Sequence, residues 1–254
     1  MSHFVVAVLS HTPEDVGTLL APYCESTEDP EYLEFEEASE PMDEIRSTFE
    51  REKAPGESLE DFVSRWYGYT YNEDLDAYGY RCNPNAKWDW WSLGGRWSDM
   101  IRLKRGCHGN RGERSWANSD ELPRDGYCDQ AQLKDVDLSP DPKAYDAAIR
   151  FWEVVVEGSP LQDGENSAQF HTFYRREYYL DQFRTKENYA RICSSFTTWA
   201  LVTPDGEWYE NGETGWFGAH NATAESRQEY ESELQQALAE ADPELWLSIV
   251  DCHI

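Results

Sequence analysis

Apolar residues form runs at both ends of the chain, and polar residues separate them from a hairpin pattern near the C-terminal end. The run FVVAVLS at Phe4–Ser10 and the apolar segment Leu245–Val250 both predict buried strands. Residues 196–202 and 207–211, joined by Pro-Asp-Gly, predict a β-hairpin. The chain is therefore expected to contain a sheet to which its two ends contribute.

Helical spacing of apolar residues recurs between these strands. The Thr-Pro pair at 12–13 predicts a helix start with Thr12 as its cap, and Ser58 with Asp61 three residues later predicts a second capped start. The longer segments with helical spacing are Met42–Glu52, Ser58–Tyr67, Lys143–Val156, Gln169–Ile192 and Ala222–Ala241. Weaker patterns predict strands at Tyr32–Phe35 and Asp99–Leu103, and a polar loop over Gly106–Arg124.

This order of elements predicts an α+β fold, in which a mostly antiparallel sheet is covered by helices on one face. We expect one domain over residues 1–254, with residues 25–67 forming an acidic, mostly helical insertion. The chain has 254 residues, of which 39 % are hydrophobic and 14 % aromatic, so it is long and apolar enough to bury a core. Disorder along the whole chain is excluded by the same composition.

Fifteen residues in the middle of the chain, NPNAKWDWWSLGGRW at Asn83–Trp97, hold four of its eleven tryptophans. Leu, Ile and Val suffice to fill a core, so this density of Trp, Asn, Lys and Arg is typical of a binding surface. Asn-Pro-Asn predicts a turn, and the alternation from Trp88 to Trp91 predicts a short strand. The Gly-Gly pair predicts positive φ or a close approach of another group to the backbone.

The motif predicts a site for an anionic, ring-bearing ligand. Lys87 and Arg96 supply charged donors for a phosphate or carboxylate, and a Trp face can stack on a ring or a cation. The predicted ligand-binding residues are Asn83, Asn85, Lys87, Trp88, Asp89, Trp90, Gly94, Gly95, Arg96 and Trp97. The alternative is structural: the same aromatic residues form a small core under a turn, and Arg96 stacks on one of them.

The motif resembles one found in an uncharacterised family of proteins from bacteriophages and prophage-bearing bacteria. Many members begin MSHF, carry NPN-KWDW-GGRW centrally and end in DCHI, and this chain has all three, at Met1–Phe4, Asn83–Trp97 and Asp251–Ile254. The segment TPDGEWYENGETGWFG at Thr203–Gly218 is similar to the family's late hairpin. The resemblance spans the chain and implies a phage or mobile-element origin, without implying an activity.

Charge is distributed unevenly. The net charge is −28, and residues 1–61 carry 17 acidic against 3 basic residues. Residues 81–115 reverse the sign, with 8 basic against 3 acidic residues. An acidic field repels nucleic acid and attracts basic surfaces, whereas the basic segment around the Trp motif suits a small anion. The alternative is that the acidity only reflects a compositional habit that favours solubility.

Several common protein classes leave motifs that this chain lacks. It has no P-loop, GxGxxG, GxSxG or HExxH, and we expect no cofactor. Six cysteines without a CxxC pair predict free thiols, and Cys107, His108 and Cys128 lack the paired spacing of a metal site. No run of 18 apolar residues and no signal peptide is evident, so we expect a cytoplasmic protein of the host cell, without membrane contact.

The two ends of the chain carry the predicted catalytic residues His3, Asp251 and His253. If the first and last strands pair antiparallel, His3 lies level with the end of the last strand. Neighbouring strands are about 4.8 Å apart, so His3 and His253 can then come into contact. Histidine is the side chain suited to proton transfer near neutrality, so His3 and His253 predict a proton-transfer pair oriented by Asp251. The alternative is that both histidines end their strands and hydrogen-bond locally.

Three functions fit these patterns. The first is a binding protein of phage or mobile-element origin that counters a host defence system. It would present its acidic surface as a nucleic-acid mimic to a basic host protein, or sequester a small anionic, ring-bearing ligand at the Trp motif. The second is an enzyme acting on a nucleotide-like substrate, and the third is a purely structural or interaction protein. Direct binding of nucleic acid is not expected.

Overall fold

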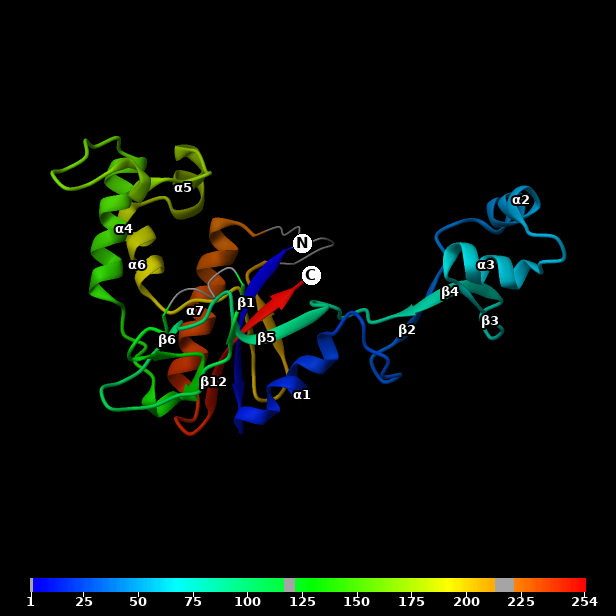
Figure 1. Ribbon diagram of the computed structural model, residues 1–254, viewed down its shortest axis with the longest axis horizontal. Coiled ribbons are helices and arrows are strands. Elements are labelled where there is room, and N and C mark those ends of the chain that lie inside the picture. The colour runs from blue at the N-terminus through cyan, green and yellow to red at the C-terminus, as the bar shows by residue number, and fades with distance from the viewer. Residues whose placement is uncertain (1, 117–121, 213–221) are drawn as a thin grey trace. The chain divides into compact units, whose positions relative to one another are not determined.

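The computed structural model describes residues 2–116, 122–212 and 222–254, which fold as α+β. The chain forms two compact units: unit 1 is Met1–Leu20 with Trp90–Ile254, and unit 2 is Ala21–Asp89. Figure 1 labels the elements of each. The predicted acidic insertion, residues 25–67, lies inside unit 2, which continues beyond it in both directions.

Unit 1 is built on a mixed sheet with the strand order β11-β10-β1-β12-β5-β7, and β9 also pairs with β12. The strands are β1 (His3–Ser10), β5 (Trp90–Gly95), β7 (Glu113–Arg114), β9 (Gln130–Gln132), β10 (Ala200–Val202), β11 (Trp208–Glu210) and β12 (Trp246–His253). Two pairs, β1 with β10 and β5 with β7, are parallel, and the other four are antiparallel.

The first and last strands, both predicted from the sequence, pair antiparallel at the centre of this sheet, which is the condition set above for His3 and His253 to meet. Their register runs from His3 opposite His253 to Ser10 opposite Trp246. The last strand is longer than the predicted Leu245–Val250, because it continues through the polar residues Asp251 to His253. Those residues are buried, so tertiary packing extends the strand past its apolar run.

Helix α7 (Ala224–Glu240) packs against the sheet through Tyr230, Leu234 and Leu238. These side chains share one core with the inward-facing Ala7 and Leu9 of β1, because alternate strand residues point to the same face. The intervening Val6 and Val8 are also fully buried. Both faces of β1 are therefore covered, which goes beyond the prediction of helices over one face. After β1, a short helical segment (η1, Pro13–Asp15) leads into α1 (Val16–Leu20), whose Val16 and Leu20 are buried.

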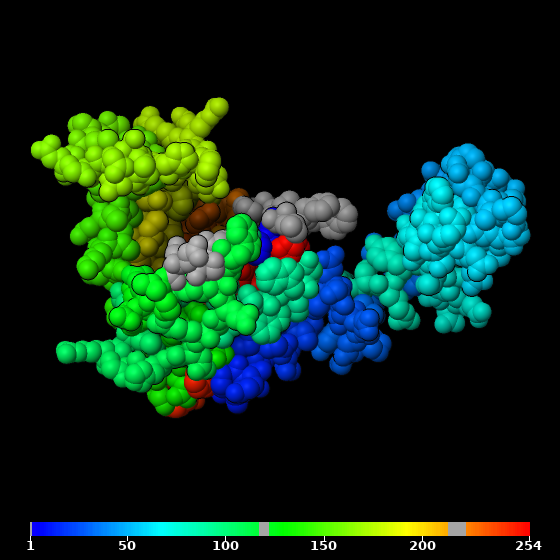
Figure 2. Space-filling view, viewed as in Figure 1, coloured from blue at the N-terminus to red at the C-terminus, as the bar shows by residue number. Residues whose placement is uncertain are grey.

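A second group of helices follows in unit 1: α4 (Pro142–Val155), α5 (Arg176–Phe183) and α6 (Lys186–Ser194). The prediction of one helix over Gln169–Ile192 is wrong. Arg184, with φ of 64°, ends α5, and the Thr185 side chain caps α6 by accepting the N–H of Asn188 at 3.2 Å. Aromatic side chains of this segment belong to a core, since Tyr179, Phe183 and Tyr189 pack with Trp152 of α4. In Figure 2 the residues of α4 and α5 occupy the upper left.

Smaller elements complete unit 1. Strand β6 (Ile101–Arg102) pairs with β8 (Tyr127–Cys128), and the helical segments η3 (Leu133–Asp135) and η4 (Ser167–Phe170) lie on either side of α4 in the chain. β6 is shorter than the predicted strand Asp99–Leu103, and the predicted loop Gly106–Arg124 includes β7. Residues 117–121 of that loop, and residues 213–218 of the hairpin-like segment Thr203–Gly218, lie outside the described residues.

Unit 2 combines helices α2 (Met42–Glu52) and α3 (Leu59–Tyr67) with a three-stranded antiparallel sheet. The sheet has the order β2 (Glu34–Glu37), β4 (Ala77–Cys82), β3 (Thr70–Asn72), and η2 (Ala21–Tyr23) precedes it. Ser58 caps α3 as predicted, since its hydroxyl accepts the N–H of Asp61 at 3.1 Å. The core is small, with Ile45, Phe62 and Val63 fully buried.

Two further expectations are met by the described residues. All six cysteines are free thiols. None of the described helices is long and apolar enough to cross a membrane.

Candidate functional site

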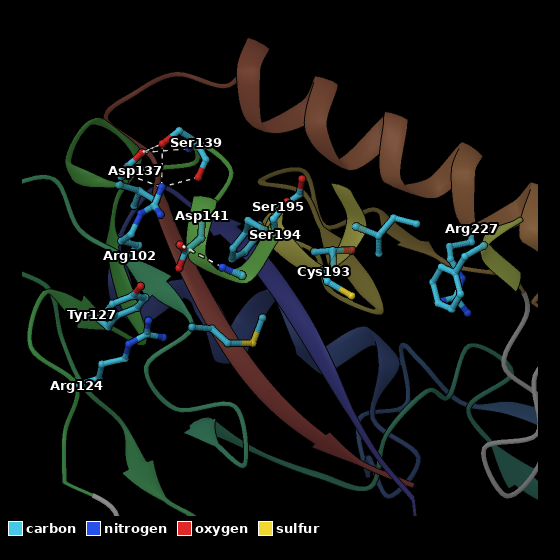
Figure 3. Close-up of a pocket in the computed structure, with 17 residues that line it drawn as sticks. Arg102, Arg124, Tyr127, Asp137, Ser139, Asp141, Cys193, Ser194, Ser195 and Arg227 are labelled. Atoms are coloured by element: carbon cyan, nitrogen blue, oxygen red, sulfur yellow. Dashed lines mark hydrogen bonds and ion pairs between the residues drawn. The ribbon is translucent and has the colours of Figure 1, made fainter. Parts of the chain in front are cut away.

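A cavity of about 470 Å³ in unit 1, here called the arginine cavity, can hold a ligand (Figure 3). Its polar lining comes from β6, β8, the start of α4, the end of α6 and α7. The polar residues are Arg102, Arg124, Tyr127, Asp137, Ser139, Asp141, Cys193, Ser194, Ser195, Thr197 and Arg227. Small-molecule sites typically measure about 300–1,000 Å³, so the cavity has the size of a ligand site.

Three guanidinium groups line this cavity, and each is held in place differently. Arg102 forms an ion pair with Asp137 at 3.0 Å and donates to Ser139 Oγ at 2.8 Å. Arg124 lies over the ring of Tyr127, 3.6 Å from its centroid. Arg227 lies over the ring of Phe183 at 5.0 Å and donates to Gln182 Oε1 at 3.2 Å. In Figure 3, Arg102 and Arg227 appear on opposite sides of the cavity.

Two carboxylates share the lining but are engaged with their own neighbours. Asp141 caps α4 and accepts the N–H of Lys143 at 2.9 Å, which lowers the pKa of Asp141. Hydrogen bonds from Ser139 lower the pKa of Asp137, and the Arg102 guanidinium lowers it further. Three cations therefore face two anions in a chain whose net charge is −28.

Two donors at this cavity lack acceptors. Nε of Arg102 and Nε of Arg227 are the buried side-chain nitrogens or oxygens without a hydrogen-bond partner among the described residues. Such groups are rare in folded proteins, and each calls for an explanation. Both belong to arginines that line the arginine cavity, so the protein leaves the donor set of these two side chains incomplete at this place.

The predicted catalytic residues come together at one end of the paired central strands β1 and β12. Nδ1 of His3 and Oδ1 of Asp251 are 2.8 Å apart, and Asp251 is 1 % exposed. The rings of His3 and His253 lie edge to face, with centroids 4.9 Å apart. Trp90, opposite His253 on β5, stacks on it at 5.4 Å. The rings of His3, His253 and Trp90 thus form one aromatic cluster, since the His3 and Trp90 rings are also 5.4 Å apart, and Asp251 holds His3.

A second cavity, of about 280 Å³, lies beside this aromatic cluster and is here called the histidine cavity. Its lining includes His3, Trp97, Tyr230 and Glu231, and it shares Arg227 with the arginine cavity. Burial raises the pKa of Glu231, an effect that its ion pair with Arg191 at 2.9 Å opposes. Burial also raises the pKa of the Tyr230 hydroxyl, which is bonded to Thr198 Oγ1 at 2.9 Å.

The Gly-Gly pair of the Trp motif makes the predicted close approach, and the approaching groups are carboxylates of the protein itself. Gly94 and Gly95 have φ of 73° and 54°. A Cβ on Gly95 would lie 2.4 Å from Asp251, and a Cβ on Gly94 would lie 2.7 Å from Asp129. Oδ2 of Asp251 also accepts the backbone N–H of Arg96 at 2.9 Å. Gly95 therefore leaves room for Asp251, the residue that orients His3, and Gly94 leaves room for Asp129.

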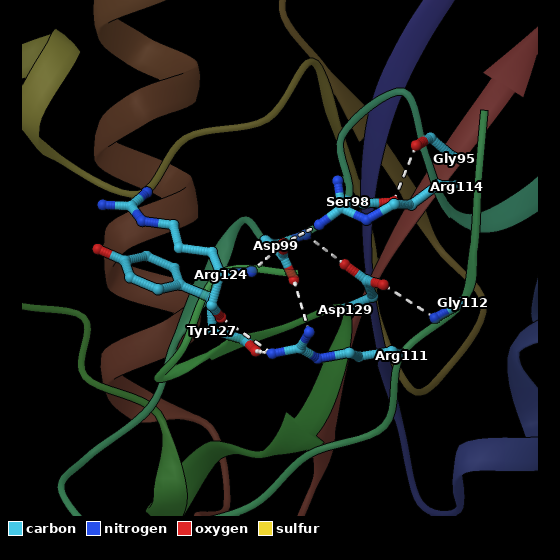
Figure 4. Close-up of polar contacts among 9 residues, drawn as sticks. All are labelled: Gly95, Ser98, Asp99, Arg111, Gly112, Arg114, Arg124, Tyr127 and Asp129. Carbon is cyan, nitrogen blue, oxygen red and sulfur yellow. Dashed lines mark hydrogen bonds and ion pairs between the residues drawn. The ribbon is translucent and has the colours of Figure 1, made fainter. Parts of the chain in front are cut away.

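A buried carboxylate network supports the arginine cavity (Figure 4). Asp129 accepts the N–H groups of Asp99 at 2.6 Å and Gly112 at 2.8 Å. Asp99 in turn accepts the backbone N–H of Arg124 at 2.8 Å and forms an ion pair with Arg114. The network fixes the backbone of Arg124, and Arg114 of the predicted basic segment serves this network.

The first half of the Trp motif belongs to unit 2 and the second half to unit 1, so each is described by itself. Asn83 is buried and donates to the carbonyls of Pro22 at 2.8 Å and Cys24 at 2.9 Å. Its Oδ1 accepts the N–H of Asn85 at 2.9 Å, as expected of the predicted turn. The strand begins at Trp90 and not at Trp88, which is buried and bridges to Cys24.

The remaining predicted ligand residues are distributed over both halves. Lys87 and Asp89 are half-buried in unit 2, whereas Trp90 and Arg96 are exposed in unit 1. Trp97 lines the histidine cavity. Within the described residues, no group of three or more His, Cys, Asp and Glu side chains is arranged to hold a metal ion.

Sequence reasoning missed most of the arginine cavity. Arg102 stood in the predicted basic segment, but Arg124, Tyr127 and Arg227 come from segments with no motif. Comparison with family models, curated proteins and solved structures finds no match to this chain.

Proposed function

We propose that unit 1 binds a small anionic ligand that carries a ring, and that the arginine cavity is its binding site. The observation that carries the proposal is the presence of three arginines around one cavity in a chain of net charge −28. Random placement of charges in so acidic a chain favours carboxylates at any surface hollow. A cavity with an excess of guanidinium groups is therefore a specific feature of this fold.

The chemistry of the lining fits an anion with a flat ring. Guanidinium groups present several donors in a plane that matches phosphate and carboxylate oxygens. The incomplete donor sets of Arg102 and Arg227 add two N–H groups that the protein does not satisfy. Tyr127 offers an aromatic ring beside Arg124, and the serines at the end of α6 offer hydroxyl groups. The ligand class is that predicted from the Trp motif, and the binding place is different.

Calorimetric titration with AMP and with adenosine tests this proposal. AMP is expected to bind more tightly than adenosine, because only AMP carries the phosphate. Arg227→Ala is expected to weaken AMP binding about 10- to 100-fold, the value of a charged hydrogen bond of about 1.5–3 kcal/mol. Saturation at about 100 times the dissociation constant should stabilise the protein by about 2.7 kcal/mol.

Arg175→Ala is the matched control, because Arg175 is exposed and forms no ion pair among the described residues. It should bind AMP as the wild type does. Equal affinities for AMP and adenosine, or an Arg227→Ala protein that binds AMP normally, would contradict the proposal.

The surface of unit 2 favours a second function, the binding of a basic protein in place of nucleic acid. Unit 2 carries 19 acidic against 6 basic residues, and 16 of the 19 acidic residues are exposed. Solvated carboxylates at this density attract basic surfaces at long range and repel nucleic acid. For a protein of phage origin, as the sequence resemblance implies, a nucleic-acid-binding protein of host defence would be the partner.

Pull-down from a bacterial lysate tests this second function. At low salt the wild type should recover nucleic-acid-binding proteins, and a variant with Glu34, Glu36 and Glu37 changed to Gln should recover fewer. The control changes three exposed acidic residues of α7 instead, namely Glu229, Glu233 and Glu240. Equal losses from the two variants would show that only total charge matters and would remove the proposed role of unit 2.

A further inference from the structure

The histidine cavity places a hydrogen-bonded imidazole beside a guanidinium that also serves the arginine cavity. His3 and Arg227 both line the histidine cavity, and Arg227 with Ile192 and Thr197 lines both cavities. Arg227 therefore belongs to both cavities, and His3 lines the second of them. This juxtaposition goes beyond binding, because imidazole is the side chain most often used to move protons near neutral pH.

Asp251 determines which nitrogen of His3 can accept a proton. Its Oδ1 lies 2.8 Å from Nδ1, and a carboxylate at that position makes Nδ1 the protonated nitrogen of a neutral ring. Nε2 is then the basic nitrogen, and among the described residues the His3 side chain makes no other hydrogen bond. Asp251 is held in turn by the N–H of Arg96 at 2.9 Å, so the pair is preorganised.

The aromatic cluster fixes the plane of the His3 ring. His253 lies edge to face with it at 4.9 Å, and Trp90 does so at 5.4 Å. These contacts together with the Asp251 bond leave the ring little freedom to turn, since its side chain is 10 % exposed. A fixed imidazole that faces a cavity is the arrangement required of a general base.

We propose that His3 is the general base of a phosphodiester hydrolase site in the histidine cavity, with Arg227 holding the phosphoryl oxygens. The proposal rests on the proposed anion binding in the arginine cavity, which anchors the rest of the substrate. A water molecule gives one proton to Nε2 of His3 while its oxygen forms a bond to phosphorus. The bond from phosphorus to one ester oxygen breaks, and that oxygen takes the proton back from the imidazolium. The products are an alcohol and a phosphomonoester, and no oxidation or reduction occurs.

The charges around the cavity favour a diester over a monoester. Of the groups that line it, Arg227 is the cation and Glu231 is a carboxylate, and Asp251 lies behind His3. A diester carries one negative charge, which one guanidinium can balance. A dianionic monoester would place a second negative charge near the carboxylates of Asp251 and Glu231. His253 and Tyr230 are the other titratable groups close to this site.

Release of nitrophenolate from bis(p-nitrophenyl) phosphate tests the proposal with the full chain. The wild type should release it catalytically, and His3→Gln should lower kcat about 100- to 10,000-fold with KM little changed, because general base catalysis acts on the chemical step. Arg227→Ala should lower kcat and should also raise KM, because Arg227 holds the phosphoryl oxygens. Asp251 is a positioning residue, so Asp251→Asn should lower kcat and leave KM in place. Because loss of folded protein would also lower the apparent kcat at constant KM, kcat is divided by the folded fraction measured by circular dichroism, and the loss should remain after this correction.

His11→Gln is the matched control, because His11 is exposed and forms no side-chain hydrogen bond or ion pair among the described residues. It should hydrolyse the diester as the wild type does. No hydrolysis by the wild type, or a fully active His3→Gln protein, would overturn the inference. If AMP still binds in an Arg227-dependent way under either of these outcomes, the proposed function stands while the hydrolase site falls. If AMP binding itself does not depend on Arg227, the proposed function fails.

Discussion

Units 1 and 2 are both acidic, but they use their carboxylates in opposite ways. Unit 1 buries Asp129 and Asp251 to 1 % exposure and meets them with backbone N–H groups and a histidine. Unit 2 leaves 16 of its 19 acidic residues exposed to solvent. A buried carboxylate is tolerated only where donors satisfy it, whereas an exposed one costs little and shapes the surrounding field. The residue type alone therefore does not show whether a carboxylate is buried and hydrogen-bonded within the fold or exposed on the surface.

The two units also differ in the size of their hydrophobic cores. In unit 1 the buried side chains of the central strands are packed against α7. In unit 2 the fully buried side chains of the core are Ile45, Phe62 and Val63, under an aromatic cover that includes Phe49 and Tyr67. A small core gives low stability, because stability grows with the apolar surface that is buried. Unit 2 is expected to be the less stable of the two.

Removing a core side chain from each unit should produce the largest effect. Phe62→Ala is expected to destabilise unit 2 by about 3–5 kcal/mol, and Ile249→Ala to destabilise unit 1 by about 2–5 kcal/mol, because both side chains are fully buried. If each unit has its own core, calorimetry should show two transitions, with each variant lowering only one of them. A single transition that both variants shift equally would mean that the two units unfold together.

Glycine-to-alanine substitutions should have an intermediate effect on stability. They separate the strain of a positive φ from a steric clash between the new Cβ and a neighbouring side chain. Gly56 in unit 2 and Gly95 in unit 1 both have positive φ, at 83° and 54°. Gly56→Ala meets no atom within 4 Å and should cost about 1–2 kcal/mol from the left-handed backbone alone. Gly95→Ala should cost more, because its Cβ would lie 2.4 Å from Asp251. Urea unfolding measures the loss of unfolding free energy in each variant. Equal losses would show that Asp251 can move away from the new Cβ at no energetic cost.

The sequence predicted local structure well wherever a side chain acts on its own neighbours. The cap at Ser58 and the turn at Asn83 follow from short-range rules, and the apolar runs at the chain ends predict the first and last strands. The helix predicted over Gln169–Ile192 failed because the break at Arg184 adopts positive φ without glycine or proline. Periodicity alone gives no sign of such a break.

The candidate sites divide along the same line. The meeting of His3 and His253 was predicted on the condition that the first and last strands pair antiparallel, and they do. The arginine cavity could not be predicted, because Arg102, Arg124 and Arg227 are far apart in sequence and come together only through the tertiary fold. The role of Gly94 and Gly95 was half predicted: the close approach was expected, but Asp129 and Asp251 as the approaching groups were not.

The smallest effect is expected from two ion pairs, one in each unit, that have nearly the same geometry. Arg150 donates twice to Glu165 in unit 1, at 2.8 and 2.7 Å, and Arg65 donates twice to Glu57 in unit 2, at 2.7 and 3.0 Å. Arg150 is 18 % exposed and Arg65 is 50 % exposed, so solvent screens the pair in unit 2 more strongly. Glu165→Gln should therefore lower Tm more than Glu57→Gln at neutral pH.

The pH dependence of that difference follows from the pKa values. The Arg150 guanidinium lowers the pKa of Glu165 from 4.5 to about 2, and Arg65 lowers that of Glu57. The folded state then binds fewer protons than the unfolded state below pH 4.5, so the stabilisation by Glu165 is complete above that pH and is lost as the pH falls toward 2. The Tm gap between wild type and Glu165→Gln should close over this range, whereas Glu229→Gln, at an exposed position of α7, should show no gap at any pH. A gap for Glu165→Gln that persists at the acid end would mean that the side chain stabilises unit 1 by packing and not by charge.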